Sequence, residues 1–246
     1  MLKLNSRHYR QSLLSLALIF VTASFAIVSS NVNPVSGQII PRQSTNWVGS
    51  IFRRRPKRPL GSRSGQICPI APGLIDTYIV WSDRPLFLWE YSGDNKPVDL
   101  VVREFDSKQN VWTQSVNLTE KKALYGGEKA LEPGKIYQWQ FSGNNNWALF
   151  KIMPTDERQN IREQLQALEQ KSNKATYSSE EIAMKKVDFF LNYEIKHQAE
   201  NKTFNAWSDA LLALYQVENP SPDFVNNREE FVQSLCSPAS SNVSKK

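Results

Sequence analysis

The sequence predicts an α+β protein in which an antiparallel β-sandwich is followed by an α-helical subdomain. Between Cys68 and about Pro154, short apolar segments are separated by turn residues at intervals of ~8–12 residues, which is typical of a sandwich. After Pro154, the apolar residues recur with the period of amphipathic helices. The short connections favour antiparallel pairing of the strands and hairpin packing of the helices.

The stretch Leu131–Phe141 gives the sharpest strand signal. Pro133-Gly134 is a turn signal, because proline presets φ and glycine tolerates positive φ. Three aromatic residues then alternate with two amides, in the order Tyr137, Gln138, Trp139, Gln140, Phe141. This period predicts buried aromatics and solvent-exposed amides. The leucine, the turn and the tyrosine together resemble the corner that enters a late strand of immunoglobulin-like and fibronectin-like sandwiches.

The rest of the β-sandwich domain, residues 67–154, is expected to supply six further strands. They are predicted over residues 75–81, 86–91, 98–105, 111–118, 123–125 and 147–153. The segments between them are rich in Gly, Asn, Asp and Ser, the residues that favour turns. Consecutive strands joined by such turns predict antiparallel neighbours.

Four helices are expected in residues 155–236. Thr155 or Asp156 is predicted to cap the first, and Ser178 with Glu181 fits the capping box of the second. The third is expected over residues 204–217, and Ser221 or Asp223 is expected to start the fourth. Their one-sided apolar stripes predict packing on each other or on the sandwich.

Residues 1–37 are predicted to be a secretory signal peptide. A polar start with three positive charges precedes the apolar run 13–28, and small residues favour cleavage after Ser30 or Gly37. The alternative is a retained membrane anchor, although the run is shorter than the ~20 residues that a spanning helix needs. Either interpretation predicts that the rest of the chain is extracytoplasmic, in the periplasm or secreted.

Residues 38–66 are predicted to be a basic, disordered linker, and residues 237–246 a disordered tail. The linker's charge is concentrated in Arg53, Arg54, Arg55, Lys57 and Arg58. These residues are either a solvated charge run or a tether to an anionic surface such as lipid headgroups. The formal net charge is +6, but residues 64–246 alone carry −4, which disfavours a nucleic-acid-binding domain.

Cys68 and Cys236 are the two cysteines of the chain, at the two ends of the predicted folded part. In an oxidising compartment this pair predicts a disulfide. The alternative is two separate thiols, since sequence alone does not bring their Cα atoms within bonding range.

The order of several motifs resembles a mostly cyanobacterial family of secreted proteins that carry a domain of unknown function. The shared features are the basic approach to Cys68-Pro69, the segment Trp81–Tyr91, the corner Leu131–Trp139 and the later Trp207-x-Asp209-Ala210-Leu211. The resemblance spans roughly residues 53–236. It implies a β domain followed by helices outside the cytoplasm, and it assigns no catalytic residues.

Catalytic and cofactor motifs are absent from the sequence, so no metal, cofactor or catalytic residue is predicted. His197 is the single histidine after the signal, in what is expected to be a polar helix end, which disfavours a triad or a zinc site. No glycine-rich phosphate loop is present. A carboxylate pair as in glycoside hydrolases stays open, with these acids on or near strands: Asp83, Glu90, Asp94, Glu104 and Asp106.

Three tryptophans are the candidate ligand or partner surface. Trp112 follows a hairpin turn, Trp147 follows three asparagines, and Trp207 lies within the third expected helix, residues 204–217. Exposed tryptophans stack on sugars or anchor protein partners, whereas the alternative is that they cover the core. Trp89 and Trp139 alternate with polar residues and are predicted to be core.

These observations favour an extracytoplasmic, non-enzymatic binding or scaffold protein that engages a protein or an envelope polysaccharide. The alternative is an envelope hydrolase that uses a carboxylate pair. A third hypothesis is a structural protein held near the membrane by its leader and its arginine cluster. A deep cleft with two acids would favour the enzyme, and an apolar patch on the helices would favour the scaffold.

Overall fold

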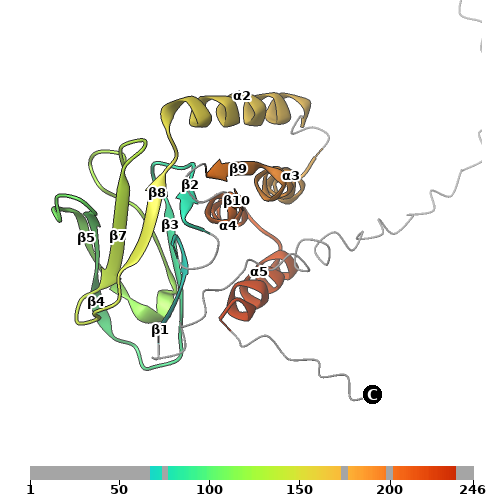
Figure 1. The fold of residues 1–246 in the computed structure, drawn as a ribbon. Coiled ribbons are helices and arrows are strands. Elements are labelled where there is room, and N and C mark those ends of the chain that lie inside the picture. Colours follow the sequence, from blue (N-terminus) through green and yellow to red (C-terminus); the bar gives the residue numbers. More distant parts are fainter. Residues whose placement is uncertain (1–66, 74–76, 173–176, 198–201, 237–246) are drawn as a thin grey trace, which may run out of the picture. The chain divides into compact units, whose positions relative to one another are not determined.

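The computed structural model describes residues 67–73, 77–172, 177–197 and 202–236. The chain divides into two units, and every described residue belongs to the second, Ser44–Lys246. The predicted signal peptide, the linker with Arg53–Arg58 and the C-terminal tail lie outside the described residues. Within them, the chain is a mixed α+β structure: a sandwich-like pair of sheets is followed by helices (Figure 1).

The larger sheet has five strands in the order β2-β8-β7-β4-β5. Their bounds are β2 Ile79–Val80, β8 Ala148–Ile152, β7 Ile136–Phe141, β4 Pro97–Glu104 and β5 Asn110–Asn117. The prediction of a purely antiparallel sandwich is wrong at one edge, because β2 pairs with β8 in parallel. The strand expected over 75–81 is reduced to two residues, since Trp81 leaves the sheet to contact the helices.

The smaller sheet is antiparallel, in the order β1-β3-β6. Its strands are β1 Ile67–Ala71, β3 Leu86–Tyr91 and β6 Lys122–Leu124. Between the sheets lies an aromatic core in which Phe87, Trp89 and Trp139 are at most 1% exposed. Both buried indoles donate their N–H groups, Trp89 to the Leu118 carbonyl at 2.8 Å and Trp139 to the Pro72 carbonyl at 2.7 Å. The assignment of these two tryptophans to the core is confirmed.

The amide face of β7 differs from its prediction. Tyr137, Trp139 and Phe141 are buried as expected, but Gln138 on the opposite face is only 3% exposed. With its oxygen turned toward Arg103 of β4, the Gln138 amide accepts two guanidinium hydrogen bonds, at 2.6 and 3.0 Å. The planar guanidinium of Arg103 therefore shields the Gln138 amide from solvent. The alternation of polar and apolar residues along β7 does not predict this burial.

Four helices follow the sheets: α2 Thr155–Lys171, α3 Ser179–Asn192, α4 Trp207–Tyr215 and α5 Pro222–Ser234. The capping box of Ser178 and Glu181 is confirmed, as is the Ser221 cap of α5. The predicted cap of α2 is wrong: Pro154 is its N-cap residue, without a side-chain hydrogen bond, and Thr155 is already helical.

A β-hairpin interrupts the helical region. Strands β9 (Glu194–His197) and β10 (Lys202–Asn205) pair antiparallel between α3 and α4. His197 therefore lies in a strand and not at the predicted helix end, and α4 begins at Trp207 and not near Phe204. The strand-forming residues are few, Ile195 in β9 and Thr203 with Phe204 in β10, so the sequence signal for these strands is short.

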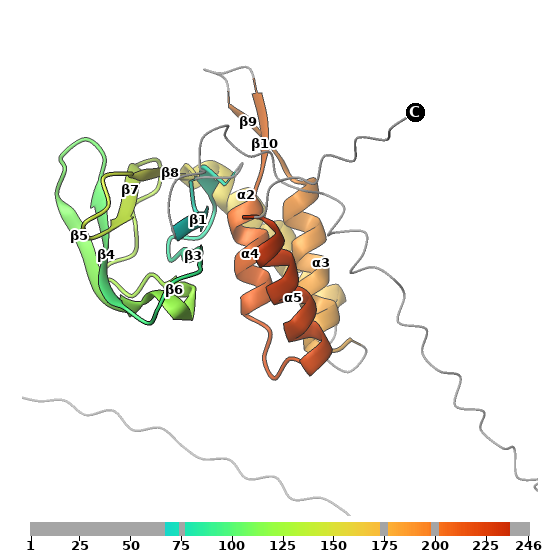
Figure 2. The same ribbon diagram turned by 90° about the horizontal axis from the view of Figure 1, so that it is seen from below.

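The helices cover the outer face of the three-stranded sheet. The side chains of Ile70, Leu86 and Leu88 are not part of the aromatic core. They pack in a second apolar cluster together with residues of the helices. Figure 2 shows β1 and β3 between the larger sheet and the pair α4 and α5. No helix among the described residues is long and apolar enough to cross a membrane.

Cys68 of β1 and Cys236, just after α5, form a disulfide, with Cα atoms 6.1 Å apart. It joins the first described strand to the end of the last helix across 168 residues. The predicted bond is confirmed. A covalent link over such a long loop restricts the unfolded chain strongly.

Removing this disulfide with Cys68→Ala and Cys236→Ala together is expected to lower the free energy of unfolding by about 3–5 kcal/mol, because a long loop is released in the unfolded state. Urea titration of both proteins under oxidising conditions measures the loss. A reductant added to the parent chain should give the same loss and should leave the double variant unchanged. Equal midpoints for parent and variant would contradict the stabilising role.

Candidate functional site

A groove runs between α2 and the pair α3 and α4. It consists of two adjoining hollows of about 390 and 310 Å³. Glu169 of α2, Lys186 of α3, Ala213 of α4 and Gln216 at the end of α4 line both hollows, so the two adjoin each other. We call this feature the α2–α4 groove.

The groove combines an apolar floor with a charged rim. Its floor is made of buried side chains from all three helices: Leu165, Ala183, Phe190, Leu212 and Ala213. Its rim carries exposed or half-buried polar groups of both signs: Arg162, Gln166, Glu169, Lys186, Gln216 and Glu218. The Lys186 ammonium and the Glu169 carboxylate form an ion pair of 2.6 Å, which links α3 to α2.

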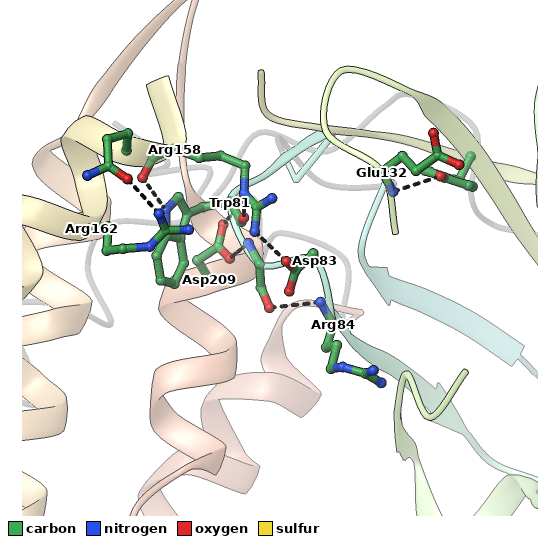
Figure 3. Close-up of polar contacts among 10 residues, drawn as sticks. Trp81, Asp83, Arg84, Glu132, Arg158, Arg162 and Asp209 are labelled. Carbon is green, nitrogen blue, oxygen red and sulfur yellow. Dashed lines mark hydrogen bonds and ion pairs between the residues drawn. The ribbon is translucent and has the colours of Figure 1, made fainter. Parts of the chain in front are cut away.

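One end of the groove is set by a polar clamp between sheets and helices (Figure 3). The two carboxylate oxygens of Asp209, in the first turn of α4, accept from the backbone N–H groups of Trp81 and Ser82 at 2.8 and 2.9 Å. Arg158 of α2 donates to the Trp81 carbonyl at 2.8 Å and pairs with Asp83 at 2.7 Å. The Trp81 indole donates back to the Arg158 carbonyl at 3.1 Å. The segment after β2 is thus held by α2 and α4 together.

Asp209 is the acid of the clamp whose pKa is shifted by its surroundings. It is 1% exposed, and burial raises its pKa from 3.8 to about 6. The two backbone N–H groups and the nearby Arg158 guanidinium act in the opposite direction, but more weakly. A carboxyl in the first turn of a helix also interacts favourably with the helix dipole. The ionised carboxylate of Asp209 therefore lowers the free energy of unfolding relative to the protonated form.

The geometry gives Asp209 a positioning role and not an exposed chemical one. Both of its oxygens accept backbone hydrogen bonds, which hold the carboxylate against the segment after β2. Three of the acids on or near strands have cation partners: Asp83 pairs with Arg158, Glu90 with Lys121 and Glu104 with Lys135. Asp94 and Asp106 are exposed turn residues. None of these five acids lines the hollows described here, so no two of them face each other across a cleft.

A third hollow, of about 520 Å³, lies at one end of the sandwich, away from the groove. The β7–β8 loop supplies a polar lining of hydroxyl and amide groups, joined by one ammonium of the β3–β4 turn: Ser142, Asn144, Asn145, Asn146 and Lys96. Asn144 orders the loop, because its side-chain oxygen accepts from the Asn146 N–H at 3.0 Å. Neutral hydrogen-bonding groups dominate the lining.

The three candidate surface tryptophans have different environments. Trp207 is 6% exposed and packs near Phe231, so the prediction that it offers a binding surface is wrong; the apolar layer of α4 and α5 covers it. Trp112 is half-buried and stacks on Phe87 at 5.7 Å, at the margin of the core. Trp147 is half-buried on the outer face, with the Arg103 guanidinium 3.7 Å from its ring centre.

Sequence reasoning missed Arg158 and missed the role of Asp209. A signal existed for each. Asp209 is the single charged residue in the buried run Ala206–Leu214, and Arg158 continues the buried stripe of Ile161 and Leu165. Charged residues on apolar stripes are rarely buried without a partner, so each predicts one.

Comparison of the chain with protein-family models, curated proteins and solved structures found no match. Among the described residues, no three His, Cys, Asp or Glu side chains gather as ligands of a metal ion.

The clamp predicts a distinct pH dependence for Asp209→Asn. The folded-state pKa is raised, so the native chain binds this proton more tightly, and the group's contribution to stability falls as the pH rises from about 4 to 6. A shift of this size corresponds to about 3 kcal/mol. The parent's stability relative to the variant should therefore shrink by about that amount between acidic and neutral pH.

Urea unfolding of both proteins from pH 3.5 to 7.5 measures this difference. The variant loses one acceptor oxygen at every pH, which adds a constant cost of about 1–3 kcal/mol. A stability difference that does not vary with pH would mean that Asp209 titrates normally.

Proposed function

We propose that this chain is a non-enzymatic scaffold protein that holds a protein partner in the α2–α4 groove. The observation that carries the proposal is the groove itself, with an apolar floor and a rim of both charge signs. Such grooves suit an amphipathic segment, whose apolar face fills the floor while its polar residues meet the rim. An apolar surface on the helices is also what the scaffold hypothesis required.

The partner segment is proposed to be an amphipathic helix or an apolar peptide carrying charges of both signs. Arg162 of α2 and Glu218, in the connection after α4, provide rim charges of opposite sign. The hydrolase alternative is less favoured by the groove. Asp209 accepts two backbone hydrogen bonds in the clamp, and Glu169 is paired with Lys186.

The proposed location is outside the cytoplasm, in the periplasm or secreted. The leader-like residues 1–37 support it, and the Cys68–Cys236 disulfide fits an oxidising compartment. In this location, the basic cluster Arg53–Arg58 is proposed to contact anionic membrane surfaces peripherally.

We further propose that the sheets form an immunoglobulin- or fibronectin-like sandwich and that α3 and α4 form a helix hairpin. The Tyr137 hydroxyl accepts from the Glu132 N–H at 3.0 Å, a tyrosine that bonds back to upstream backbone as in the corner of such sandwiches. Helices α3 and α4 pack extensively. The resemblance to the secreted cyanobacterial family is part of this proposal.

An envelope polysaccharide at the end of the sandwich is a second candidate. The amide- and hydroxyl-lined hollow of the β7–β8 loop favours it, because such groups form hydrogen bonds with sugar hydroxyls. Trp147 follows that loop, but the Arg103 guanidinium lies over its ring.

The groove is tested by photo-crosslinking in the native envelope. A photoreactive amino acid replaces Gln216, an exposed rim residue, or Gln170, an exposed α2 residue outside the groove lining. Position 216 is expected to give one discrete protein adduct that position 170 lacks. Adding Gln166→Arg to the Gln216 probe should weaken that adduct by blocking the floor.

Two results would contradict this function. Identical adducts from both positions would mean that contact is not specific to the groove. No protein adduct at position 216, together with retention of the chain on envelope glycan that is lost in Asn145→Ala, would replace the protein partner by the polysaccharide.

A further inference from the structure

The four edges of the two sheets are protected very differently. Edge strand β2 has only two residues and runs directly into the clamp. Edge strand β1 contains Pro69, an irregular register and the disulfide. Edge strand β6 has three residues and includes Lys122. Short length, proline, irregular pairing and lysine are the features that prevent an edge from pairing with another chain.

Strand β5 is less protected: its pairing with β4 shifts register at one place, between Val102 and Arg103, and is regular from Trp112 to Asn117. It is eight residues long, and β4 is its single neighbour within the described part of the chain. Its sequence, Asn-Val-Trp-Thr-Gln-Ser-Val-Asn, contains no charge and no proline. Alternate residues of an edge strand direct their N–H and C=O groups away from the sheet, so β5 offers a free ladder of donors and acceptors.

We propose that β5 is a dimerisation edge that pairs antiparallel with β5 of a second copy of this chain. A strand without charges faces no like-charge repulsion when it meets itself, which a charged edge would. A two-fold axis perpendicular to the sheet keeps both outer faces on one side and joins the two five-stranded sheets into one.

The favoured register places the two-fold axis at Gln114. Thr113 then lies opposite Ser115 of the second copy, a hydroxyl pair on the outer face. Trp112 lies opposite Val116 of the second copy, an aromatic and β-branched pair on the core face. Both pair types stabilise neighbouring strands. An axis at Thr113 would instead set Trp112 against a glutamine and Val111 against a serine, which pack less well.

The pairing is expected to be reversible, because a single edge buries less than the ~1,200 Å² of stable interfaces. The residues of the α2–α4 groove lie on other elements, so the dimer is independent of the proposed partner binding. Failure of one proposal therefore leaves the other untouched.

Sedimentation of the chain, as produced by an exporting host, over a wide concentration series tests the dimer. Thr113→Lys with Ser115→Lys places lysines opposite each other twice across the axis and should raise the dissociation constant at least about tenfold. The matched control adds the same two charges to α2, as Ala167→Lys with Gln170→Lys, both exposed, and should dimerise like the parent.

Gln114→Cys tests the register without weakening the edge. Both native cysteines are in the disulfide, so the new thiol is free to react. Mild oxidation should give a covalent dimer for Gln114→Cys, because the two residues 114 face each other across the axis. Val111→Cys should give none, because residue 111 lies far from residue 111 of the second copy.

A parent chain that stays monomeric over the whole series would overturn the proposal, as would a dimer that the two lysines leave intact. Covalent dimers from Val111→Cys in place of Gln114→Cys would overturn the register. A monomer whose β5 instead captures an extended segment of another protein would replace the second copy as the occupant.

Discussion

The carboxylate of Asp209, with its two backbone hydrogen bonds to Trp81 and Ser82, is the interaction on which the arrangement of sheets and helices depends. Because Trp81 and Ser82 donate to Asp209 of α4, β2 ends after two residues and the segment before β3 lies against α4. Arg158 then uses the carbonyl of the same tryptophan to place the start of α2. One short segment between two strands thereby positions two helices that follow it by more than seventy residues.

This clamp specifies geometry more than it adds stability. A buried carboxylate whose pKa is raised to about 6 is costly when charged, and its hydrogen bonds offset only part of the cost. The apolar layer between the helices and the outer face of β1 and β3 stabilises the same junction, and the disulfide constrains it covalently. A purely apolar contact would allow the helices to slide, whereas paired N–H donors fix one position.

The proposed surfaces use separate parts of this framework. The α2–α4 groove exists because α2 is anchored at its start by Arg158, while its later turns meet α3 through the ion pair of Lys186 and Glu169. Strand β5 lies at the opposite end of the sheet order from β2, the strand that contacts α4. A second copy on β5 would therefore leave the helices free to bind a partner.

Local sequence patterns were sufficient to predict the α+β class, the aromatic face of β7, the core tryptophans and the cap at Ser178, and they limited the start of α5 to Ser221 or Asp223. These features follow from local periodicity and turn chemistry, which act over a few residues. The pairing of the two cysteines was predicted from their number and position, and the structure confirms it.

Three features follow from tertiary contacts: the parallel pairing of β2, the burial of Trp207 and Gln138, and the clamp of Asp209 with Arg158 (Figure 3). Each depends on residues that are far apart in the chain: 128 residues separate Trp81 from Asp209. Local patterns mark such residues as buried or charged, but they carry no information about which distant group lies opposite.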